Sequence, residues 1–436
     1  MFKPKAIYYE KEIENYELGK QLLEKYKEIP KIEIENHNNI EEMRKKQNKE
    51  FINMKRNLII GVRKTHKFVE NHKTSDYLVP YTSSGCTAAC MYCYLVCNYN
   101  KCAYLRLFVN REQMLDKIIK IANKAEKELT FEIGSNSDLI LENTITGNLP
   151  WTIENFKNSP KGYLTFPTKF DMVDDILNID HQGKVTVRMS VNPEEIINKV
   201  EFGTSRLKGR IEAINKLKEA GYKVGILIAP VIMVENWKEL YSELIKQLSE
   251  NLTEKVKKDA FFEIIFMTYS FVHTKINEEA FPNAINLYNK DLMTGRGKGK
   301  YMYKIGIRKD GENFLREQMK KYLASLLALV MCLSLLAACA SDPIGEEAPQ
   351  PVGEPSQETA ATGRLRVKFK QGEVPERIIE TRSGLQTGSE PLDRAIAALG
   401  VTRMQRVFPP AGRFDFVHDA DVPLLEEDEK QEKAAA

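Results

Sequence analysis

Apolar runs of strand length alternate with amphipathic segments of helix length through the middle of the chain. The apolar runs are rich in Val, Ile and Phe, as buried strands are. The segments between them repeat apolar residues every three or four positions, which predicts helices with one buried face. The predicted strands are 129–135, 162–170, 184–192, 222–230 and 261–268, and the predicted helices are 111–129, 172–179, 205–221 and 236–252. Strands that alternate with helices form parallel βα units, and with about six of them we expect an α/β protein built as a partial (β/α)6 TIM-type barrel.

Polar residues follow three of the predicted strands at their carboxyl ends. The three polar segments are Gly134–Ser137, Thr168–Lys169 and Ser190–Asn192. In barrels of parallel strands the catalytic groups stand at these ends, because the loops after the strands meet on one face. One polar strand end means little, but three together predict a functional site on this face of the barrel.

The region before the barrel has a different pattern. Residues 11–57 are rich in Lys and Glu, with apolar positions at helical spacing around Tyr16–Tyr26. This pattern predicts a solvated helical cap rather than a basic binding arm. We therefore divide the front of the chain into an N-terminal α/β cap region, the barrel and a C-terminal segment, with the bounds 1–80, 81–270 and 271–322.

The composition of the chain changes near residue 323. Residues 1–322 carry 52 Lys and Arg against 43 Asp and Glu, a net charge of +9, whereas residues 323–436 carry 12 against 18, a net charge of −6. The first part holds 28 Asn and the second holds none. The whole chain, with 42% hydrophobic and 29% charged residues, is too polar for a multi-pass membrane protein and too apolar for a disordered one. The change at residue 323 indicates two unrelated parts.

An apolar run, LASLLALVMCLSLLAACA, begins the second part at residues 323–340. It follows Lys320 and Lys321 and ends in small residues, which is the pattern of a secretory signal peptide. It is also just long enough to span a bilayer. The residues around Cys339 resemble the lipid-attachment site near the start of bacterial lipoproteins, and a buried core helix is the alternative. We expect this segment to take no part in the function of residues 1–322. We also expect that any membrane contact is made only through this segment.

The rest of the tail is predicted to be a linker and a small module. Residues 341–363 are rich in Pro, Glu, Gln, Gly and Thr, which is typical of a flexible linker. Residues 364–436 hold two strand patterns, a short helix pattern and an acidic end, so we expect a small α+β or partly disordered module without a catalytic constellation. The strand patterns are 364–372 and 412–422, and the helix pattern is 392–401.

Five of the seven cysteines lie between residues 86 and 102. Cys86, Cys90 and Cys93 have the spacing C-x3-C-x2-C, and Tyr92 would shield one face of a ligand site there. Zinc sites usually take four ligands in two separated pairs, and no second pair follows in the sequence. Three close thiolates suit a [4Fe–4S] cluster that leaves one iron open to a small ligand. A zinc site and an accidental grouping are the alternatives.

The cysteine spacing, with an aromatic residue before the third cysteine, resembles the signature of the radical S-adenosylmethionine superfamily. In that superfamily the open iron binds S-adenosylmethionine, and an electron from the cluster yields a 5′-deoxyadenosyl radical. Longer stretches resemble one family within it, spore photoproduct lyase, over about residues 5–322. They are CTAACMYCYLVCNYNKCAYLRLFVN, FEIGSNSD, PTKFD, NIDHQGKVTVRMSVN, EFGTSRLKGRIEA and GKGKYMY, in the order of the family.

The resemblance implies the activity and the site. Members of the family repair spore photoproduct, 5-thyminyl-5,6-dihydrothymine, in spore DNA by removing a hydrogen from C6 of the lesion and later returning one to a thymine radical. The resemblance implies that Cys86, Cys90 and Cys93 hold the cluster, that Tyr92, Ser137, Lys169, Ser190 and Asn192 line the cofactor and lesion pocket, and that Tyr94 and Lys169 act in catalysis.

One departure from the family concerns the hydrogen donor. The family usually has a cysteine shortly before the Ser-Asp pair that follows the strand predicted at 129–135, and that thiol returns the hydrogen. Here the stretch is Gly134–Asp138, which contains no thiol. Cys97 and Cys102 are the other thiols in the front of the chain, and we favour Cys97 because it lies close to a cluster ligand and to Tyr94. The alternative is that both are spare packing or surface thiols.

A basic segment follows the barrel. The stretch TGRGKGKYMYK places cations and aromatic residues among glycines, a pattern that suits phosphates and stacked bases. By resemblance it approaches DNA and holds the lesion outside the duplex, since a stacked base cannot reach an enzyme pocket. The net charge of +9 in the front suits a polyanion, and a solvated basic hairpin is the alternative. The candidate contacts to DNA and the lesion are Arg296, Lys298, Lys300 and Tyr301.

These patterns leave three readings of the function. The first is a DNA repair lyase that acts on duplex DNA carrying a thymine lesion and receives electrons from a donor such as a flavodoxin or ferredoxin. The second is a radical S-adenosylmethionine enzyme of the same fold with another substrate. The third is an inactive front carried by a lipoprotein. We expect a cytoplasmic location in the spore or germinating cell, because an oxidising compartment would damage the cluster.

Overall fold

The computed structural model describes residues 2–71, 74–98, 104–338, 379–381 and 384–386; within them, side chains are described except at residue 98 and beyond 322. The chain forms two compact units, and the described residues as far as Ala337 belong to the first.

A curled sheet of seven strands forms the centre of the first unit. Six of its strands are parallel neighbours, and β4 (Val69–Glu70) adds an antiparallel edge. The parallel strands, in sheet order, are β5 (Tyr77–Leu78), β9 (Thr130–Glu132), β10 (Tyr163–Thr168), β11 (Val185–Val191), β13 (Lys223–Val231) and β14 (Phe261–Phe266). The partial (β/α)6 barrel expected from the sequence is confirmed.

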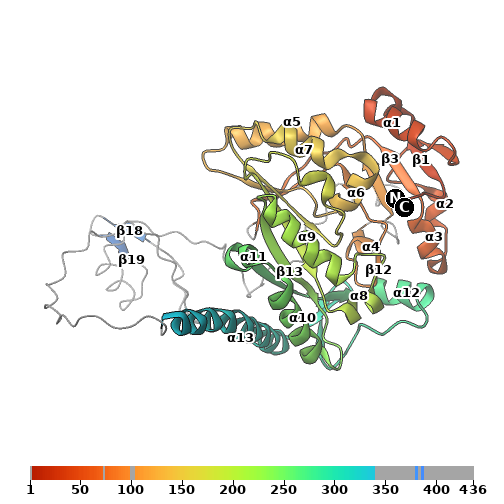
Figure 1. Ribbon diagram of the computed structural model, residues 1–436. Helices are drawn as coiled ribbons and strands as arrows, with labels where there is room; N and C mark the ends of the chain where they lie inside the picture. The colour runs from red at the N-terminus through yellow and green to blue at the C-terminus, as the bar shows by residue number, and fades with distance from the viewer. Residues whose placement is uncertain (1, 72–73, 99–103, 339–378, 382–383, 387–436) are drawn as a thin grey trace, which may run out of the picture. The chain divides into compact units, whose positions relative to one another are not determined.

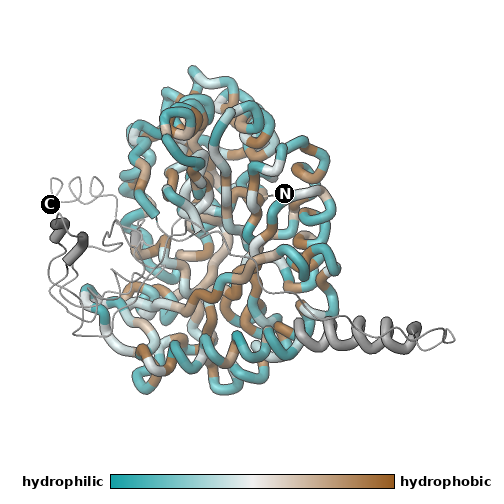
Figure 2. Tube along the Cα trace, turned by 90° about the vertical axis from the view of Figure 1, so that its left-hand side faces the viewer, coloured by the Kyte–Doolittle hydropathy of each residue, from teal (hydrophilic) through white to brown (hydrophobic). Residues whose placement is uncertain are grey.

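Helices lie along the outside of this sheet (Figure 1). Figure 2 shows apolar residues gathered on the inner strands and polar residues on the outer helices. Phe131, Phe166, Val187 and Ile226, one from each of four strands, are fully buried in the core between them. The covering helices are α5 (Arg111–Lys124), α6 (Leu139–Thr146), α7 (Asn148–Phe156), α8 (Glu194–Val200), α9 (Leu207–Glu219), α10 (Trp237–Asn251) and α11 (Glu254–Asp259), and a 3-10 helix, η3, spans Asp174–Ile176.

The N-terminal region contains a second sheet that the helical pattern did not predict. Four of its strands run parallel and β6 joins β8 antiparallel. The strands, in sheet order, are β2 (Lys31–Ile34), β1 (Ile7–Glu10), β3 (Leu58–Gly61), β8 (Leu105–Phe108) and β6 (Ser83–Ser84). The expected helix is present as α1 (Glu17–Lys25), but the cap is built on a sheet, and that sheet continues past residue 80.

Short helices complete the N-terminal region. They are η1 (Lys11–Asn15), α2 (Glu41–Arg44), η2 (Asn48–Glu50) and α3 (Phe51–Lys55). Between β6 and β8 the chain makes β7 (Ala89–Cys90) and α4 (Leu95–Asn98). The segment with the cysteines therefore connects two strands of the N-terminal sheet.

A small antiparallel sheet follows the barrel. Its strands are β15 (Thr268–Ser270), β17 (Lys300–Tyr303) and β16 (Met293–Gly297), in that spatial order. Helix α12 (Phe271–Ala280) leaves β15 directly, and α13 (Ile305–Ala338) follows β17. The hairpin β16–β17 carries the basic segment recognised in the sequence.

The composition boundary at residue 323 falls inside α13, whose backbone is helical from Ile305 to Ala338. Where side chains are described, no helix is both long enough and apolar enough to cross a membrane. In the second unit the described residues form a two-stranded antiparallel pair, β18 (Ile379–Thr381) with β19 (Gly384–Gln386). The predicted linker and the elements at 364–372, 392–401 and 412–422 lie outside the described residues.

Candidate active site

The three cysteines of the motif lie on one loop that is tied to the barrel on both sides. Before Cys86, the N–H of Gly85 donates to the carbonyl of Asn136 at 2.7 Å, which joins the loop to the end of β9. At Cys90, β7 pairs with β12 (Glu201–Phe202), which follows β11 and α8. The loop is therefore held against the carboxyl ends of the strands, where the sequence predicted the site.

The thiols of this loop fit an iron–sulfur cluster. Cys86, Cys90 and Cys93 are free and partly buried. Burial raises the pKa of the Cys86 thiol to about 12, although the nearby Lys55 acts in the opposite direction, and burial raises the pKa of Cys90 as well. Thiols in such surroundings ionise when a metal takes the place of the proton. Among the described residues, no three His, Cys, Asp or Glu side chains are gathered around one point that a single metal ion could occupy.

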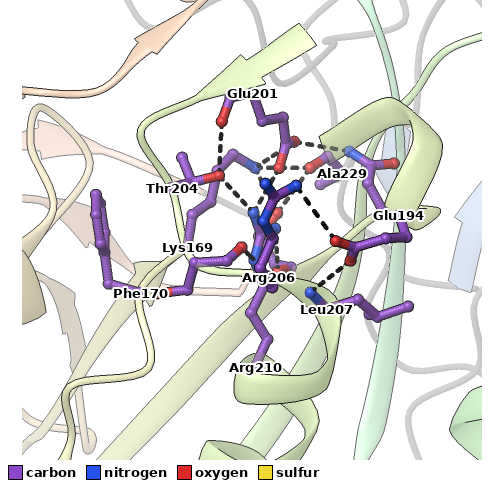
Figure 3. Close-up of polar contacts among 12 residues, drawn as sticks. Lys169, Phe170, Glu194, Glu201, Thr204, Arg206, Leu207, Arg210 and Ala229 are labelled. Atoms are coloured by element: carbon purple, nitrogen blue, oxygen red, sulfur yellow. Dashed lines mark hydrogen bonds and ion pairs between the residues drawn. The ribbon is translucent and has the colours of Figure 1, made fainter. Parts of the chain in front are cut away.

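A buried carboxylate, Glu201, is contacted by four polar side chains beside the loop. Figure 3 shows two of them, Lys169 and Arg210, around Glu201. Arg210 Nη2 donates to its Oε2 at 2.7 Å, and Asn192 Nδ2 donates to its Oε1 at 2.8 Å. Lys169 Nζ lies 3.5 Å from Oε1, and the hydroxyl of Tyr92 donates to the same oxygen. Three expected pocket residues, Tyr92, Lys169 and Asn192, therefore meet at one point.

Two cations keep Glu201 charged. Burial alone would raise its pKa, but the charges of Lys169 and Arg210 lower the pKa to about 2. A buried ion pair is stable only while each partner is present, because a lone charge in the interior is costly. Sequence reasoning missed Glu201 and Arg210. Arg210 carried a signal, since it stands on the apolar face of its predicted helix, three residues after Leu207 and one before Ile211.

Lys169 connects three strand ends. Its Nζ donates to Ser190 Oγ at 2.5 Å and to the carbonyl of Ala229 at 2.8 Å. Ser190 Oγ donates to the same carbonyl at 2.7 Å, so β10, β11 and β13 meet here. The Lys169 side chain is 21% exposed.

The polar residues that follow β9 contact the cysteine loop and the strand before it. The Tyr94 hydroxyl donates to the carbonyl of Ser135, and Ser83 Oγ donates to Ser137 Oγ at 2.7 Å. Sequence reasoning missed Asp138, which is buried and accepts from Thr168 Oγ1 at 2.8 Å and from the Lys169 N–H at 2.9 Å. Asp138 thus fixes the backbone from which the Lys169 side chain extends.

Cys97 lies in a separate polar group next to the loop. Its Sγ is 3.3 Å from Ser270 Oγ and 3.9 Å from His273 Nε2. The other ring nitrogen of His273 is 2.9 Å from Ser270 Oγ, and Nε2 is 3.0 Å from the carbonyl oxygen of Cys93. Burial raises the pKa of Cys97, so its sulfur keeps its proton at neutral pH. The second candidate donor, Cys102, lies outside the described residues.

The basic hairpin adjoins this group through the β15–β17 ladder. Lys300 pairs with Ser270 across the two strands, and Tyr301 pairs with Tyr269. Lys298 and Lys300 are exposed, whereas Arg296 and Tyr301 are partly buried. The structure therefore places the four candidate DNA-contacting residues on one hairpin whose inner strand faces the Cys97 group.

Comparison with known proteins matches these features to one family. The protein-family model of spore photoproduct lyase matches residues 2–329. The chain is 35% identical over 331 residues to the spore photoproduct lyase of Bacillus subtilis (strain 168), which covers 74% of this chain and 95% of that protein.

Solved structures agree with this match. A spore photoproduct lyase complexed with dinucleoside spore photoproduct superposes with a TM-score of 0.69 at 31% identity, covering 74% of this chain and 96% of that one. A variant with two substitutions, cysteine to alanine and serine to cysteine, holds bound AdoMet and dinucleoside spore photoproduct; its TM-score, identity and coverage are the same. This chain belongs to the spore photoproduct lyase family.

Proposed function

We propose that this chain is a radical S-adenosylmethionine lyase that cleaves spore photoproduct back to two thymines. The observation that carries the proposal is the three-cysteine loop bound to the strand ends next to the Lys169–Glu201 pair. The match to a lyase over 95% of its length supports the same activity.

Different residues of the site would bind the cluster and S-adenosylmethionine. Cys86, Cys90 and Cys93 would hold a [4Fe–4S] cluster, and Lys169 stands beside them as a cation for the carboxylate of S-adenosylmethionine. When bound, the cluster and S-adenosylmethionine supply the 5′-deoxyadenosyl radical that takes hydrogen from C6 of the lesion. Tyr92, on the same loop, and Ser137, after β9, would line the pocket for these cofactors.

We assign the return of hydrogen to Cys97. The strand end at Gly134–Asp138 has no thiol, and an S–H bond gives up a hydrogen atom far more readily than the O–H of serine or the N–H of an amide. Burial keeps Cys97 protonated, and Ser270 with His273 holds its sulfur beside the cluster loop. Cys97 would give the hydrogen of its S–H bond to the thymine radical, and the Tyr94 hydroxyl would then give a hydrogen to the Cys97 sulfur radical. Because the hydrogen first taken from the lesion would replace the one lost by Tyr94, the repair needs no net oxidant or reductant.

Single replacements of the two thiols, Cys97 and Cys102, test this assignment. In anaerobically reconstituted protein with S-adenosylmethionine and a dinucleotide lesion, Cys97→Ala should still form 5′-deoxyadenosine but lose thymine formation at least about tenfold, because the product radical is left without a donor. Both products are followed together by chromatography, with Cys102→Ala as the matched control. Clean repair by Cys97→Ala would reject the assignment to Cys97, and repair lost only in Cys102→Ala would move it to Cys102.

Duplex DNA that carries the lesion is the partner we propose for the basic hairpin. The exposed Lys298 and Lys300 suit phosphates, and the net charge of +9 over residues 1–322 suits a polyanion. Binding should weaken steeply with added salt, which a titration of labelled duplex measures; salt-independent binding would contradict the proposal.

We propose a flavodoxin or ferredoxin as the electron donor and the cytoplasm of the spore or germinating cell as the location. The four described cysteines are free thiols, which fits a reducing compartment. Each purified donor is mixed with the assembled cluster, and the loss of the cluster's visible absorbance measures its reduction. The donor that reduces the cluster is thereby identified. Cell fractionation tests the location, and recovery outside the cytoplasm would contradict it.

A further inference from the structure

An exposed aromatic residue, Phe271, is the first residue of α12 and lies beside the turn of the basic hairpin. Its side chain is 55% exposed, and the next residue, Val272, is 40% exposed. The Phe271 N–H donates to the carbonyl of Gly299 at 2.9 Å, which continues the β15–β17 ladder by one more bond. The ring is therefore fixed to the hairpin turn rather than carried on a separate loop.

The hairpin turn has a defined shape. Gly297 pairs with Lys300, so Lys298 and Gly299 form a two-residue loop, and their φ angles are +48° and +68°. Two positive φ angles are typical of the tight hairpin turn whose twist matches its strands. Lys298 thus stands at the tip of the turn, in an αL conformation that few residues other than Gly adopt.

Three lysines lie on the hairpin turn or next to the Phe271 ring, one of which, Lys275, also pairs with Glu278 at 3.9 Å. Lys298 and Lys300 are exposed on the turn, and Lys275 Nζ lies 5.4 Å from the centre of the Phe271 ring. The stretch 293–304 contains four basic residues and no acidic one. A flat apolar ring among cations matches nucleic acid, which offers base faces for the ring and phosphates for the ammonium groups.

The position of Phe271 relative to the active site is set by the residue before it. Ser270 faces inward, where its Oγ lies 3.3 Å from Cys97 Sγ, while Phe271 is exposed on the surface. DNA held against the ring is therefore one residue away from the group that holds the donor thiol. Extrusion of a base from the duplex is the step that must occur at such a place.

We propose that Phe271 is a wedge that stacks into the gap left in the duplex when the lesion is extruded. Flipping a base out of a duplex loses stacking, and apolar side chains inserted at a base step compensate for that loss in other DNA-bending proteins. The cations of the hairpin hold the backbone while the ring occupies the gap. This inference rests on the proposed repair of DNA, and it concerns duplex substrates rather than the chemistry itself.

The test compares two substrates with one set of variants. Phe271→Ala should lower repair of lesion-containing duplex about tenfold or more, because base stacking on the ring is lost, while repair of the free dinucleotide stays within about twofold of the parent. Phe271→Trp should keep duplex repair. Phe261→Ala is the matched control, since Phe261 is a 40% exposed phenylalanine at the opposite, N-terminal end of β14.

A second readout does not depend on repair. A 2-aminopurine placed next to the lesion should change its fluorescence on binding the parent and Phe271→Trp, but not on binding Phe271→Ala. Equal fluorescence changes with Phe271→Ala, or equal loss of dinucleotide and duplex repair, would overturn the wedge. A parent protein that shows the fluorescence change without repairing the dinucleotide would support the wedge and reject the proposed repair function instead.

Discussion

Glu201 controls the charge balance of the site. It is one anion between two cations, Lys169 and Arg210, and its strand β12 pairs with Cys90. Glu201 therefore both neutralises the two buried cations through its side chain and holds the cluster loop in place through its backbone pairing with Cys90. A neutral residue in its place would leave two cations without a partner in a buried region, which is the costly half of breaking a buried pair.

Glu201→Gln should lower the free energy of unfolding by about 3–5 kcal/mol, because Lys169 and Arg210 lose their counter-charge. Anaerobic urea unfolding of the cluster-free chain measures this change. The control is Glu254→Gln, in which the side chain is 75% exposed and the effect should be at most about 1 kcal/mol. Equal effects of the two substitutions would show that Glu201 is not the charge centre of the site.

At the level of elements, the N-terminal sheet depends on another buried carboxylate. Glu10, at the end of β1, accepts from the N–H of His37 at 2.9 Å, from His37 Nδ1 at 2.8 Å and from the N–H of Val62 at 2.8 Å. A Cβ on Gly61 would stand 2.7 Å from its Oε2 and 2.9 Å from His37 Nδ1, so a larger residue there would push this pair of side chains out of place. These bonds join β1, β3 and the turn after β2.

The contribution of Glu10 to stability should depend on pH. Burial alone would raise its pKa, but the bonds from His37 and Val62 hold the pKa below the ordinary 4.5. The stabilisation is therefore complete above pH 4.5 and is lost as the pH falls through the lowered pKa. Glu10→Gln should cost about 1–3 kcal/mol at pH 7 and much less at the acid end. Urea midpoints over a pH series measure the difference, with the exposed Glu24→Gln as control; a pH-independent difference would contradict it.

Local patterns predicted the barrel, and long-range pairing explains what they missed. The helix α9 and the strands β10, β11 and β13 follow periodicities that lie within one segment, so they were predicted close to their bounds. The strands of the N-terminal sheet are four residues or shorter, and β3 pairs with β8 across more than forty residues. A periodicity cannot show such a partner.

The same distinction applies to the site. The cluster cysteines were predicted because their chemistry depends on spacing within one loop, and the polar strand ends were predicted because they follow recognisable strands. Glu201 and Asp138 were missed because their importance lies in partners from other elements, Lys169 above all. The hydrogen donor stays a prediction, since the structure places Cys97 beside Ser270 but does not describe Cys102.

At the scale of the whole molecule, the family match ends close to the change in composition. The match stops at residue 329, and the first part of α13 packs on the barrel through Leu315, Met319 and Tyr322. We therefore expect the part of the chain that matches the family to require α13 as far as Tyr322 for its stability.

A chain that ends at Tyr322 should keep both cofactor cleavage and lesion repair at the level of the full chain, because it keeps these contacts. A chain that ends at Lys304 should lose solubility or activity, because the buried Leu315 is removed with α13. Product formation and thermal unfolding of the two truncated chains measure this. Loss of activity on cutting at Tyr322 would show that the tail belongs to the enzyme. Membrane fractionation of the full and the shortened chain tests contact through 323–340.

The cysteine loop lies between two strands of the N-terminal sheet, and this position bears on how the cluster is assembled while the chain is being synthesised. That sheet is complete in the sequence at Phe108, whereas β9 begins at Thr130 and Glu201 comes later still. Domains fold from the N-terminus during synthesis. If the N-terminal sheet forms as soon as it has been made, the cysteine loop is held at both ends before β9 and β12 exist. We therefore expect iron and sulfide to reach the three thiols more readily in a chain stopped after Phe108 than in the complete chain, which the rate of cluster assembly in the two chains would measure.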